Sequence, residues 1–168
     1  MTQLTLSLKP QESRAVSHIA SDFSCDDHIV ARGISILENR VKRSRPLDSP
    51  KDVRDFCVLK LSPLEHEVFY CLYLNNQLEY IDSHEMFRGT LSQATVYPRE
   101  VAKEALKRNA AAIIVAHNHP SGRLDPSRAD IQMTKQLEQA MQLLDIRLVD
   151  HILVAGGKSL SLKEGGYF

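Results

Sequence analysis

Two continuous apolar runs lie in the middle of the chain, and each is long enough to form a buried strand. Residues 67–74 read Glu-Val-Phe-Tyr-Cys-Leu-Tyr-Leu, a run rich in residues that favour strands. Residues 111–116 read Ala-Ala-Ile-Ile-Val-Ala and lead directly into His117. A strand without polar alternation is typical of the interior of a sheet, where both faces are covered. We therefore expect two inner strands, the second of which carries His117 at its end.

Shorter strands are predicted on either side of these runs. Asn75-Asn76 is a turn signal, so residues 78–81 are expected to form the return strand of a hairpin. Gly156-Gly157 is a second turn signal. Further short strands are predicted at residues 95–97, 148–155 and 159–162.

Helices are predicted where apolar residues recur at intervals of three and four. The first such pattern consists of Val30, Ile34, Leu37 and Val41. It predicts an amphipathic helix from about residue 25 to 43. Residues 1–20 are polar and irregular, which is typical of a mobile arm. Three further helices are expected to begin near Pro50, Pro98 and Ser127, and the last two are expected to end near residues 109 and 144.

Two of these helix starts carry capping signals. Ser49 precedes Pro50 and lies three residues before Asp52, while Ser127 lies three residues before Asp130. A serine at such a position accepts a hydrogen bond from the backbone of the third helical residue, and an acidic residue there can reach back to the serine. Both serines are therefore expected to be N-caps.

Hairpins and single helices are mixed along the chain, which predicts an α/β (α+β) fold with helices flanking a mixed sheet. The length of 168 residues corresponds to about one domain. The segment from Pro46 to Pro50 is the expected boundary. Residues 1–46 would then form an N-terminal arm and amphipathic helix, and residues 47–168 the folded domain.

The composition is ordinary for a globular protein, with 43% hydrophobic and 25% charged residues. The 21 basic and 21 acidic residues balance, so no overall field attracts nucleic acid or an anionic membrane. No apolar run approaches the ~18 residues that a membrane span needs. The three cysteines are widely spaced, which suits reduced thiols better than disulfides. We expect a cytoplasmic protein without membrane contact.

Basic residues gather at the end of the first predicted helix, as Arg40, Lys42, Arg43 and Arg45. They could make weak contact with DNA, or they could simply complement the negative end of the helix dipole. The apolar stripe of the same helix could pack on the domain or on a second copy in a homodimer.

Residues 116–122 read Ala-His-Asn-His-Pro-Ser-Gly and contain two histidines two residues apart. Such side chains face the same way only where the backbone is extended, and Pro120 disfavours helical geometry at His119. The imidazoles of His117 and His119 are therefore expected to converge. Asp130 follows beyond a loop. Two nitrogens and one carboxylate are a ligand set typical of a catalytic zinc ion, with the fourth position open to water.

Other interpretations of these residues are open. Surface histidines are common, and Asp130 has a structural role available as the acidic residue of a helix that Ser127 caps. The two roles of Asp130 are compatible, because the first turn of a helix is a rigid place for a ligand. Two histidines and one carboxylate also describe the iron site of some oxygenases, so the metal could be iron rather than zinc.

These residues resemble the JAMM metalloprotease domain, also called MPN+, in its RadC-like branch. The family pattern is an upstream glutamate, then His-x-His-Pro, then Ser-x-x-Asp, with ten residues between the second histidine and the aspartate. Here His117 to Pro120, Ser127 and Asp130 match it, and residues 120–129 supply the ten. The variant His-Asn-His-Pro-Ser-Gly indicates the RadC-like branch. Further matches to that branch are Phe87-Arg88-Gly89-Thr90, Pro98-Arg99-Glu100 and Asp150-His151.

The resemblance covers about residues 48–168 and implies both a fold and a reaction. The fold is a curved mixed β-sheet flanked by helices, with layers arranged as in cytidine deaminases. The reaction is the hydrolysis of a peptide or isopeptide amide in a peptide or protein substrate of unknown identity. The implied cofactor is a zinc ion held by His117, His119 and Asp130.

The resemblance also implies a glutamate that takes the proton of the attacking water and later delivers it to the leaving amine. Glu67 is its counterpart, although Tyr70 stands where the family has glycine. Glu65 lies one strand alternation away and is a competitor for this role. Ser127 corresponds to a family serine that is thought to hydrogen-bond the tetrahedral oxyanion.

Two other functions are open at this point. RadC-like proteins are linked by tradition with DNA repair and recombination, so the chain could be an accessory protein that binds DNA rather than a peptidase. It could also be a metal-free interaction domain, although all three expected ligands are present.

Several residues near the motif are expected to be structural. His151 lies in an apolar strand, where a core histidine held by a hydrogen bond is more common than a fourth metal ligand. Ser121 and Gly122 are expected only to form a turn.

Overall fold

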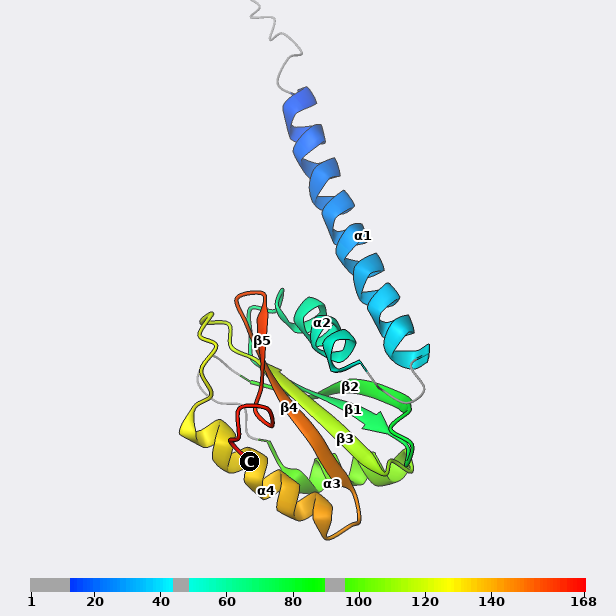
Figure 1. Ribbon diagram of the computed structural model, residues 1–168. Helices are drawn as coiled ribbons and strands as arrows, with labels where there is room; N and C mark the ends of the chain where they lie inside the picture. Colours follow the sequence, from blue (N-terminus) through cyan, green and yellow to red (C-terminus); the bar gives the residue numbers. More distant parts are fainter. Residues whose placement is uncertain (1–12, 44–48, 90–95) are drawn as a thin grey trace, which may run out of the picture. The chain divides into compact units, whose positions relative to one another are not determined.

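The computed structural model describes residues 13–43, 49–89 and 96–168, with side chains from residue 26 onward (Figure 1). The chain divides into two compact units, Met1–Gly33 and Ile34–Phe168, and the second unit holds the five strands found among the described residues. None of the described helices is long and apolar enough to cross a membrane. The elements in chain order are α1 (Ser13–Arg43), α2 (Pro50–Leu61), β1 (Val68–Leu74), β2 (Tyr80–Arg88), α3 (Pro98–Lys107), β3 (Ala112–Asn118), α4 (Arg128–Gln142), β4 (Arg147–Ala155) and β5 (Lys158–Ser161).

The strands form one sheet in the order β2-β1-β3-β4-β5. β3 and β4 are parallel, and every other neighbouring pair is antiparallel. A parallel pair needs a crossover connection, and α4 supplies it between β3 and β4. This arrangement confirms the predicted α/β (α+β) fold, in which helices flank a mixed sheet. The two long apolar runs are inner strands, as expected, and every residue of β1 and β3 is buried.

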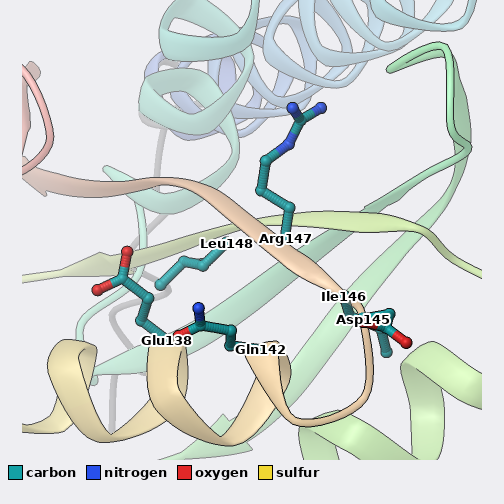
Figure 2. Close-up of a pocket in the computed structure, with 6 residues that line it drawn as sticks. All are labelled: Glu138, Gln142, Asp145, Ile146, Arg147 and Leu148. Carbon is teal, nitrogen blue, oxygen red and sulfur yellow. The ribbon is translucent and has the colours of Figure 1, made fainter.

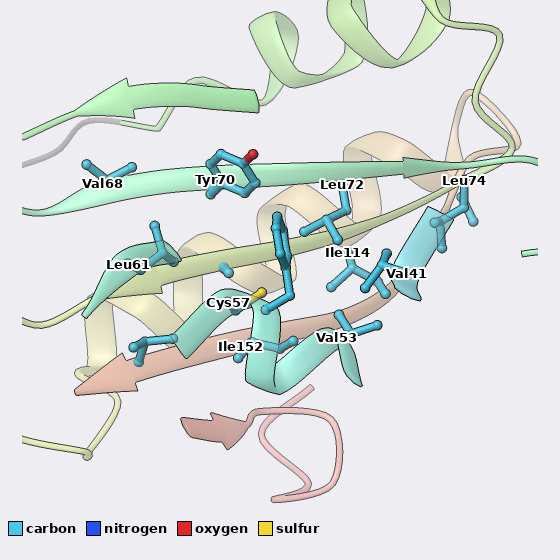
Figure 3. Packing of buried hydrophobic residues seen from close by; sticks show 14 residues of the cluster. Val41, Val53, Cys57, Leu61, Val68, Tyr70, Leu72, Leu74, Ile114 and Ile152 are labelled. Atoms are coloured by element: carbon cyan, nitrogen blue, oxygen red, sulfur yellow. The ribbon is translucent and has the colours of Figure 1, made fainter. Parts of the chain in front are cut away.

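Helices cover the two faces of the sheet separately, with α2 on one face and α3 and α4 on the other (Figure 1). Because successive side chains of a strand point to opposite faces, β1 contributes alternate residues to two separate cores. Figure 3 shows the first core, where α2 packs on β1, β3 and β4 through Val53, Phe56, Cys57 and Leu61. The last turns of α1 join this core through Ile34, Leu37 and Val41.

The predicted helix start at Ser49 is confirmed. Its side chain accepts a hydrogen bond from the backbone N–H of Asp52 at 3.3 Å, and Pro50 occupies the first turn. The Gly156-Gly157 turn is also confirmed between β4 and β5. Both glycines have positive φ angles, 54° and 74°, which the two-residue turn of a tight hairpin requires.

The predicted strand at residues 78–81 is wrong in its position and length, because β2 runs from Tyr80 to Arg88. Leu78 has a positive φ of 62° and belongs to the turn. The Asn75 side chain stabilises that turn by accepting hydrogen bonds from the backbone of Gln77 and Glu79. β2 is an edge strand with much of its length partly exposed, so its polar sequence gave no apolar run to detect.

The strand predicted at 95–97 is also wrong where the structure describes it. Val96 and Tyr97 pair with no strand, and Tyr97 is the N-cap of α3, whose extended backbone resembles that of a strand. Thr95 lies outside the described residues.

The irregular arm predicted for residues 1–20 is wrong from Ser13 onward, because α1 begins there rather than near residue 25. No proline or glycine interrupts the sequence between Ser13 and Asp27, so its polarity is compatible with a solvated helix. Residues 1–12 lie outside the described residues.

The first prediction concerns the central strand. Leu72→Ala should reduce the free energy of unfolding by about 2–5 kcal/mol, because Leu72 is fully buried in β1 and its truncation leaves a cavity. The matched control is Leu106→Ala on α3, where the side chain is 56% exposed and the change should be about 0.5 kcal/mol or less. Urea unfolding of both variants measures the difference. Equal losses at the two sites would contradict the layered core.

Candidate metal centre

Three separate segments bring ionisable side chains to one end of the sheet. β3 carries His117 as its penultimate residue, and His119 follows the strand. β1 pairs antiparallel with β3, with Phe69 opposite His117. Glu67, two residues before Phe69, therefore lies beside the segment that holds His119. Asp130 comes from the first turn of α4, which begins after the loop that follows His119.

One ligand atom from each of Glu67, His117, His119 and Asp130 lies within 4.8 Å of all the others. The Nε2 atoms of the two histidines are 3.1 Å apart. The His117 Nε2 is 3.5 Å from Asp130 Oδ1, and the His119 Nε2 is 3.5 Å from Asp130 Oδ2. Atoms bound at ~2.0–2.1 Å to a tetrahedral zinc ion lie about 3.3–3.5 Å apart, so the separations between these donors are close to those of a zinc site.

The backbone around His119 orients its ring toward this cluster. The His119 N–H donates a hydrogen bond to the carbonyl of Val154 at 2.8 Å. Its ring Nδ1 is 3.0 Å from the carbonyl oxygen of Arg123. A carbonyl can only accept, so Nδ1 carries a proton and Nε2 is the nitrogen directed at the cluster. The turn itself closes through Gly122, which has a φ of 76°, as expected for a turn-forming glycine.

Asn118, between the two histidines, holds the segment of Glu67 in place. Its side-chain oxygen accepts a hydrogen bond from the Val68 N–H at 2.8 Å. Its amide nitrogen donates to the backbone carbonyls of Leu64 and His66, at 3.3 Å and 3.0 Å. The sequence interpretation missed this role. The available signal was alternation, because a polar residue between two inward histidines points to the opposite, buried face and needs partners there.

The capping box predicted at the start of α4 is confirmed. The Ser127 Oγ accepts a hydrogen bond from the Asp130 N–H at 3.1 Å, and an oxygen of the Asp130 carboxylate accepts one from the Ser127 N–H at 2.7 Å. The same carboxylate faces both histidines, so Asp130 caps the helix and lines the cluster at once.

Burial and mutual charges shift the pKa values of all four groups. Burial lowers the pKa of His117 to about 4 and raises the pKa of Glu67. Interaction with Asp130 raises the pKa of His119 against the effect of its partial burial. Burial acts to raise the pKa of Asp130, but the neighbouring histidines and Ser127 hold it well below its usual range. These shifts favour a neutral His117 and an ionised Asp130, which are the forms in which the two residues can bind a divalent cation.

Two residues that the sequence placed near the site lie outside the cluster. Glu65 is exposed, and it is not among the four residues whose ligand atoms converge. His151 is fully buried behind His117, and its Nε2 is 2.7 Å from the His117 Nδ1. This confirms the expectation of a core histidine held by hydrogen bonds.

The basic residues at the end of α1 lie on a different element from the cluster. Arg40 and Arg43 are exposed, whereas Lys42 forms an ion pair with Glu38 at 2.8 Å and lies over the Tyr80 ring. Arg45 lies outside the described residues. DNA contact through these residues stays a prediction.

Hollows adjoin the cluster on two sides. One, of about 110 Å³, has Glu67, His117 and Asp130 in its wall together with apolar residues. Another, of about 400 Å³, lies along His119 and the loop that follows it. A third hollow, at the far end of α4, is lined by Glu138, Gln142, Asp145, Ile146, Arg147 and Leu148 (Figure 2). In Figure 2 the Arg147 guanidinium points away from Glu138 and Gln142, so the polar groups there do not converge.

Comparison with known proteins places these observations in a family context. Residues 47–167 match the family model of the RadC-like JAB domain. The chain is similar to UPF0758 proteins of Cupriavidus pinatubonensis (55% identical over 120 residues), Nitrosospira multiformis (50% over 130) and Marinobacter nauticus (47% over 131). These matches cover 71%, 77% and 78% of this chain and 53%, 58% and 58% of the relatives. The chain therefore spans about half the length of the curated relatives it matches.

These similarities confirm the resemblance read from the motif, and the mixed sheet with its flanking helices is consistent with a JAB fold. The four clustered side chains could bind a metal ion, as in JAB domains.

The second prediction tests the cap of α4. Ser127→Ala should reduce the free energy of unfolding by about 1 kcal/mol, because the N–H of Asp130 loses its acceptor. Ser127→Gly should reduce the free energy of unfolding by only a few tenths of a kcal/mol, because glycine is tolerated at N-caps. Chemical denaturation compares both variants with Ser121→Ala, a change at an exposed turn residue. An unchanged stability of Ser127→Ala would show that the cap contributes nothing.

The third prediction is that the metal-free protein loses stability as the pH falls from about 6.5 toward 4. Burial lowers the pKa of both His117 and His151, so the unfolded chain binds more protons than the folded one in this window. Each histidine contributes a slope of up to about 1.4 kcal/mol per pH unit. The raised pKa of His119 acts in the opposite direction, because its contribution is lost as the pH rises.

Urea unfolding in the presence of a chelator at pH 7, 6 and 5 measures this slope. His151→Gln removes one of the two groups responsible and should make the slope smaller. A metal-free protein that became more stable on acidification would contradict the assignment of these two histidines as neutral.

Proposed function

The chain belongs to the RadC-like JAB domain family, and from this premise we propose that it is a zinc-dependent hydrolase that cleaves a peptide or isopeptide amide bond. The observation that carries the proposal is the convergence of His117, His119 and Asp130 on a space of the size that one metal ion fills. The proposal concerns the reaction of this domain, because the chain spans about half of each relative.

His117, His119 and Asp130 would hold the ion. Two imidazole nitrogens and one carboxylate form a common ligand set of catalytic zinc, and the separations of 3.1 Å and 3.5 Å suit tetrahedral geometry. Iron sites of the two-histidine, one-carboxylate type are usually octahedral and keep further positions open. The choice of zinc follows from the match of these residues to the JAMM motif and of the domain to the RadC-like JAB family. When bound, the ion would acidify water and polarise the substrate carbonyl.

Glu67 is the proposed general base. It lies within the cluster but comes from a different segment from the histidines, the residue just before β1, and it lines a hollow beside the cluster. Its raised pKa, caused first by burial, makes the carboxylate a stronger base than an exposed glutamate. It would accept a proton from the attacking water and deliver that proton to the nitrogen of the leaving amine. Glu65 is exposed and lacks this burial.

Ser127 is the proposed donor to the developing oxyanion. In the capping box its oxygen accepts a hydrogen bond from the Asp130 N–H, which leaves its own proton free. No described residue accepts that proton. The Ser127 hydroxyl can therefore cap α4 and donate a hydrogen bond to the oxyanion at the same time. A preorganised hydroxyl donor of this kind can contribute about 3 kcal/mol to stabilisation of the transition state.

The fourth prediction separates Glu67 from Glu65. Glu67→Gln should lower kcat for amide cleavage by about 10²–10⁴-fold, because the amide cannot take the water proton. Glu65→Gln is the matched control and should stay within about threefold of the native protein. Cleavage is measured by mass spectrometry on a peptide library that includes lysine-linked isopeptides, with the zinc-loaded full chain.

Chelation should abolish the same activity, and added zinc should restore it. Metal titration of His119→Ala should show loss of binding, whereas Glu67→Gln should still bind the ion. Activity that survives Glu67→Gln would remove this residue from the proposed role. Elemental analysis showing iron rather than zinc in the purified protein would overturn the choice of metal.

A further inference from the structure

A buried chain of hydrogen bonds runs behind the metal cluster. His117 Nδ1 is 2.7 Å from His151 Nε2, and His151 Nδ1 is 2.6 Å from the Thr134 Oγ1. The Thr134 hydroxyl in turn lies 2.6 Å from the backbone carbonyl oxygen of Asp130. Thr134 and His151 are fully buried, and His117 is 2% exposed. The chain connects α4, β4 and β3, and it begins and ends at residues of the cluster.

The positions of the protons on Thr134, His151 and His117 can be assigned by starting from the Asp130 carbonyl, at one end of this chain of hydrogen bonds. A carbonyl oxygen can only accept, so the single hydroxyl proton of Thr134 is donated to Asp130. Thr134 must then accept a hydrogen bond from His151, which places the proton of His151 on Nδ1. Both ring nitrogens of His151 are used by these partners and no carboxylate contacts the ring among the described residues, so a charged imidazolium would lack a counter-ion in the core.

A neutral His151 with its proton on Nδ1 has only a lone pair on Nε2. The His117 Nδ1 must therefore carry a proton and donate it to His151. The His117 Nε2 is left with its lone pair, and this is the atom that lies 3.1 Å from His119 and 3.5 Å from Asp130. If His117 instead carried its proton on Nε2, two lone pairs would face each other at 2.7 Å inside the core, and both acceptors would be unsatisfied.

We propose that Thr134 and His151 are positioning residues that fix His117 in the Nδ1–H tautomer and so present its Nε2 lone pair to a divalent cation. The inference rests on the metal binding in the proposed function but needs no hydrolysis. For His119, the Arg123 carbonyl keeps the proton on Nδ1 by direct contact. For His117, the hydrogen bonds through His151 and Thr134 would have the same effect. The Phe69 ring packs edge-on against His151 at 5.8 Å, which keeps the imidazole in the plane that both hydrogen bonds require.

The test uses Thr134→Val, which has nearly the shape of threonine but no hydroxyl, and Thr134→Ser, which keeps the hydroxyl. Without the hydroxyl, His151 loses its acceptor and can place its proton on Nε2, and His117 must then hold its own proton on the metal side. Removing such an outer partner of a ligand typically weakens metal binding by about 10–100-fold. We expect a loss in this range for Thr134→Val and a change of less than about threefold for Thr134→Ser.

Two measurements are made on the full-length chain. Long-range ¹H–¹⁵N correlation spectra of the metal-free native protein should show His117 and His151 as Nδ1–H tautomers, and Thr134→Val should shift His117 toward Nε2–H. Zinc dissociation constants are measured by competition with a chromophoric chelator. His151→Gln can still offer an oxygen to the His117 Nδ1–H and should retain more affinity than His151→Leu, which cannot.

Native spectra with His117 protonated on Nε2, or equal zinc affinities for Thr134→Val and Thr134→Ser, would overturn the inference. The tautomer assignment uses the native protein, so this test does not depend on whether a variant folds. A protein that shows the expected tautomers and binds zinc but cleaves no amide would end the hydrolase proposal and leave this inference standing. Amide cleavage that depends on Glu67, together with an unchanged zinc affinity of Thr134→Val, would support the hydrolase proposal and overturn this inference.

Discussion

β1 and β3 pair antiparallel from Phe69 and His117 to Leu74 and Ala112, and every residue of both strands is buried. A strand that slipped by one residue would exchange the two cores, because each alternate side chain would move to the other face. The register is therefore strongly specified by burial. The same register sets Phe69 opposite His117, and so it fixes where Glu67 meets the loop of His119. The chemistry at the end of the sheet is in this way a consequence of packing at its centre.

The polar groups at that end are held by contacts from several elements. Asn118 ties the loop of the histidines to the segment before β1, the capping box ties Asp130 to Ser127, and the chain through His151 and Thr134 ties β3 to α4. The contacts of Asn118, and those through His151 and Thr134, satisfy donors and acceptors that would otherwise be buried without a partner. Groups held in this way need little rearrangement to bind an ion, which is the usual basis of strong binding by a preformed site.

Much of the fold was readable from the sequence, because its signals are local. Apolar runs without alternation identified the inner strands, and the serines at 49 and 127 identified two helix starts. Elements without an apolar signal were misjudged. β2 is a partly exposed edge strand with a polar sequence, and the first part of α1 is polar, so neither produced the pattern that a buried face imposes.

The sequence by itself determined which residues could bind a metal, because the spacing of His117, His119 and Asp130 depends on one strand end and one helix start. It could not choose between Glu67 and Glu65, since that choice depends on where β1 begins and which strand lies beside it. Nor could it identify the hydrogen-bond partners of Asn118, Thr134 and His151. Apart from the Asp130 carbonyl that Thr134 contacts, their partners lie 17 to 54 residues away in the chain, and only the packing of β1, β3, β4 and α4 brings them within hydrogen-bond distance.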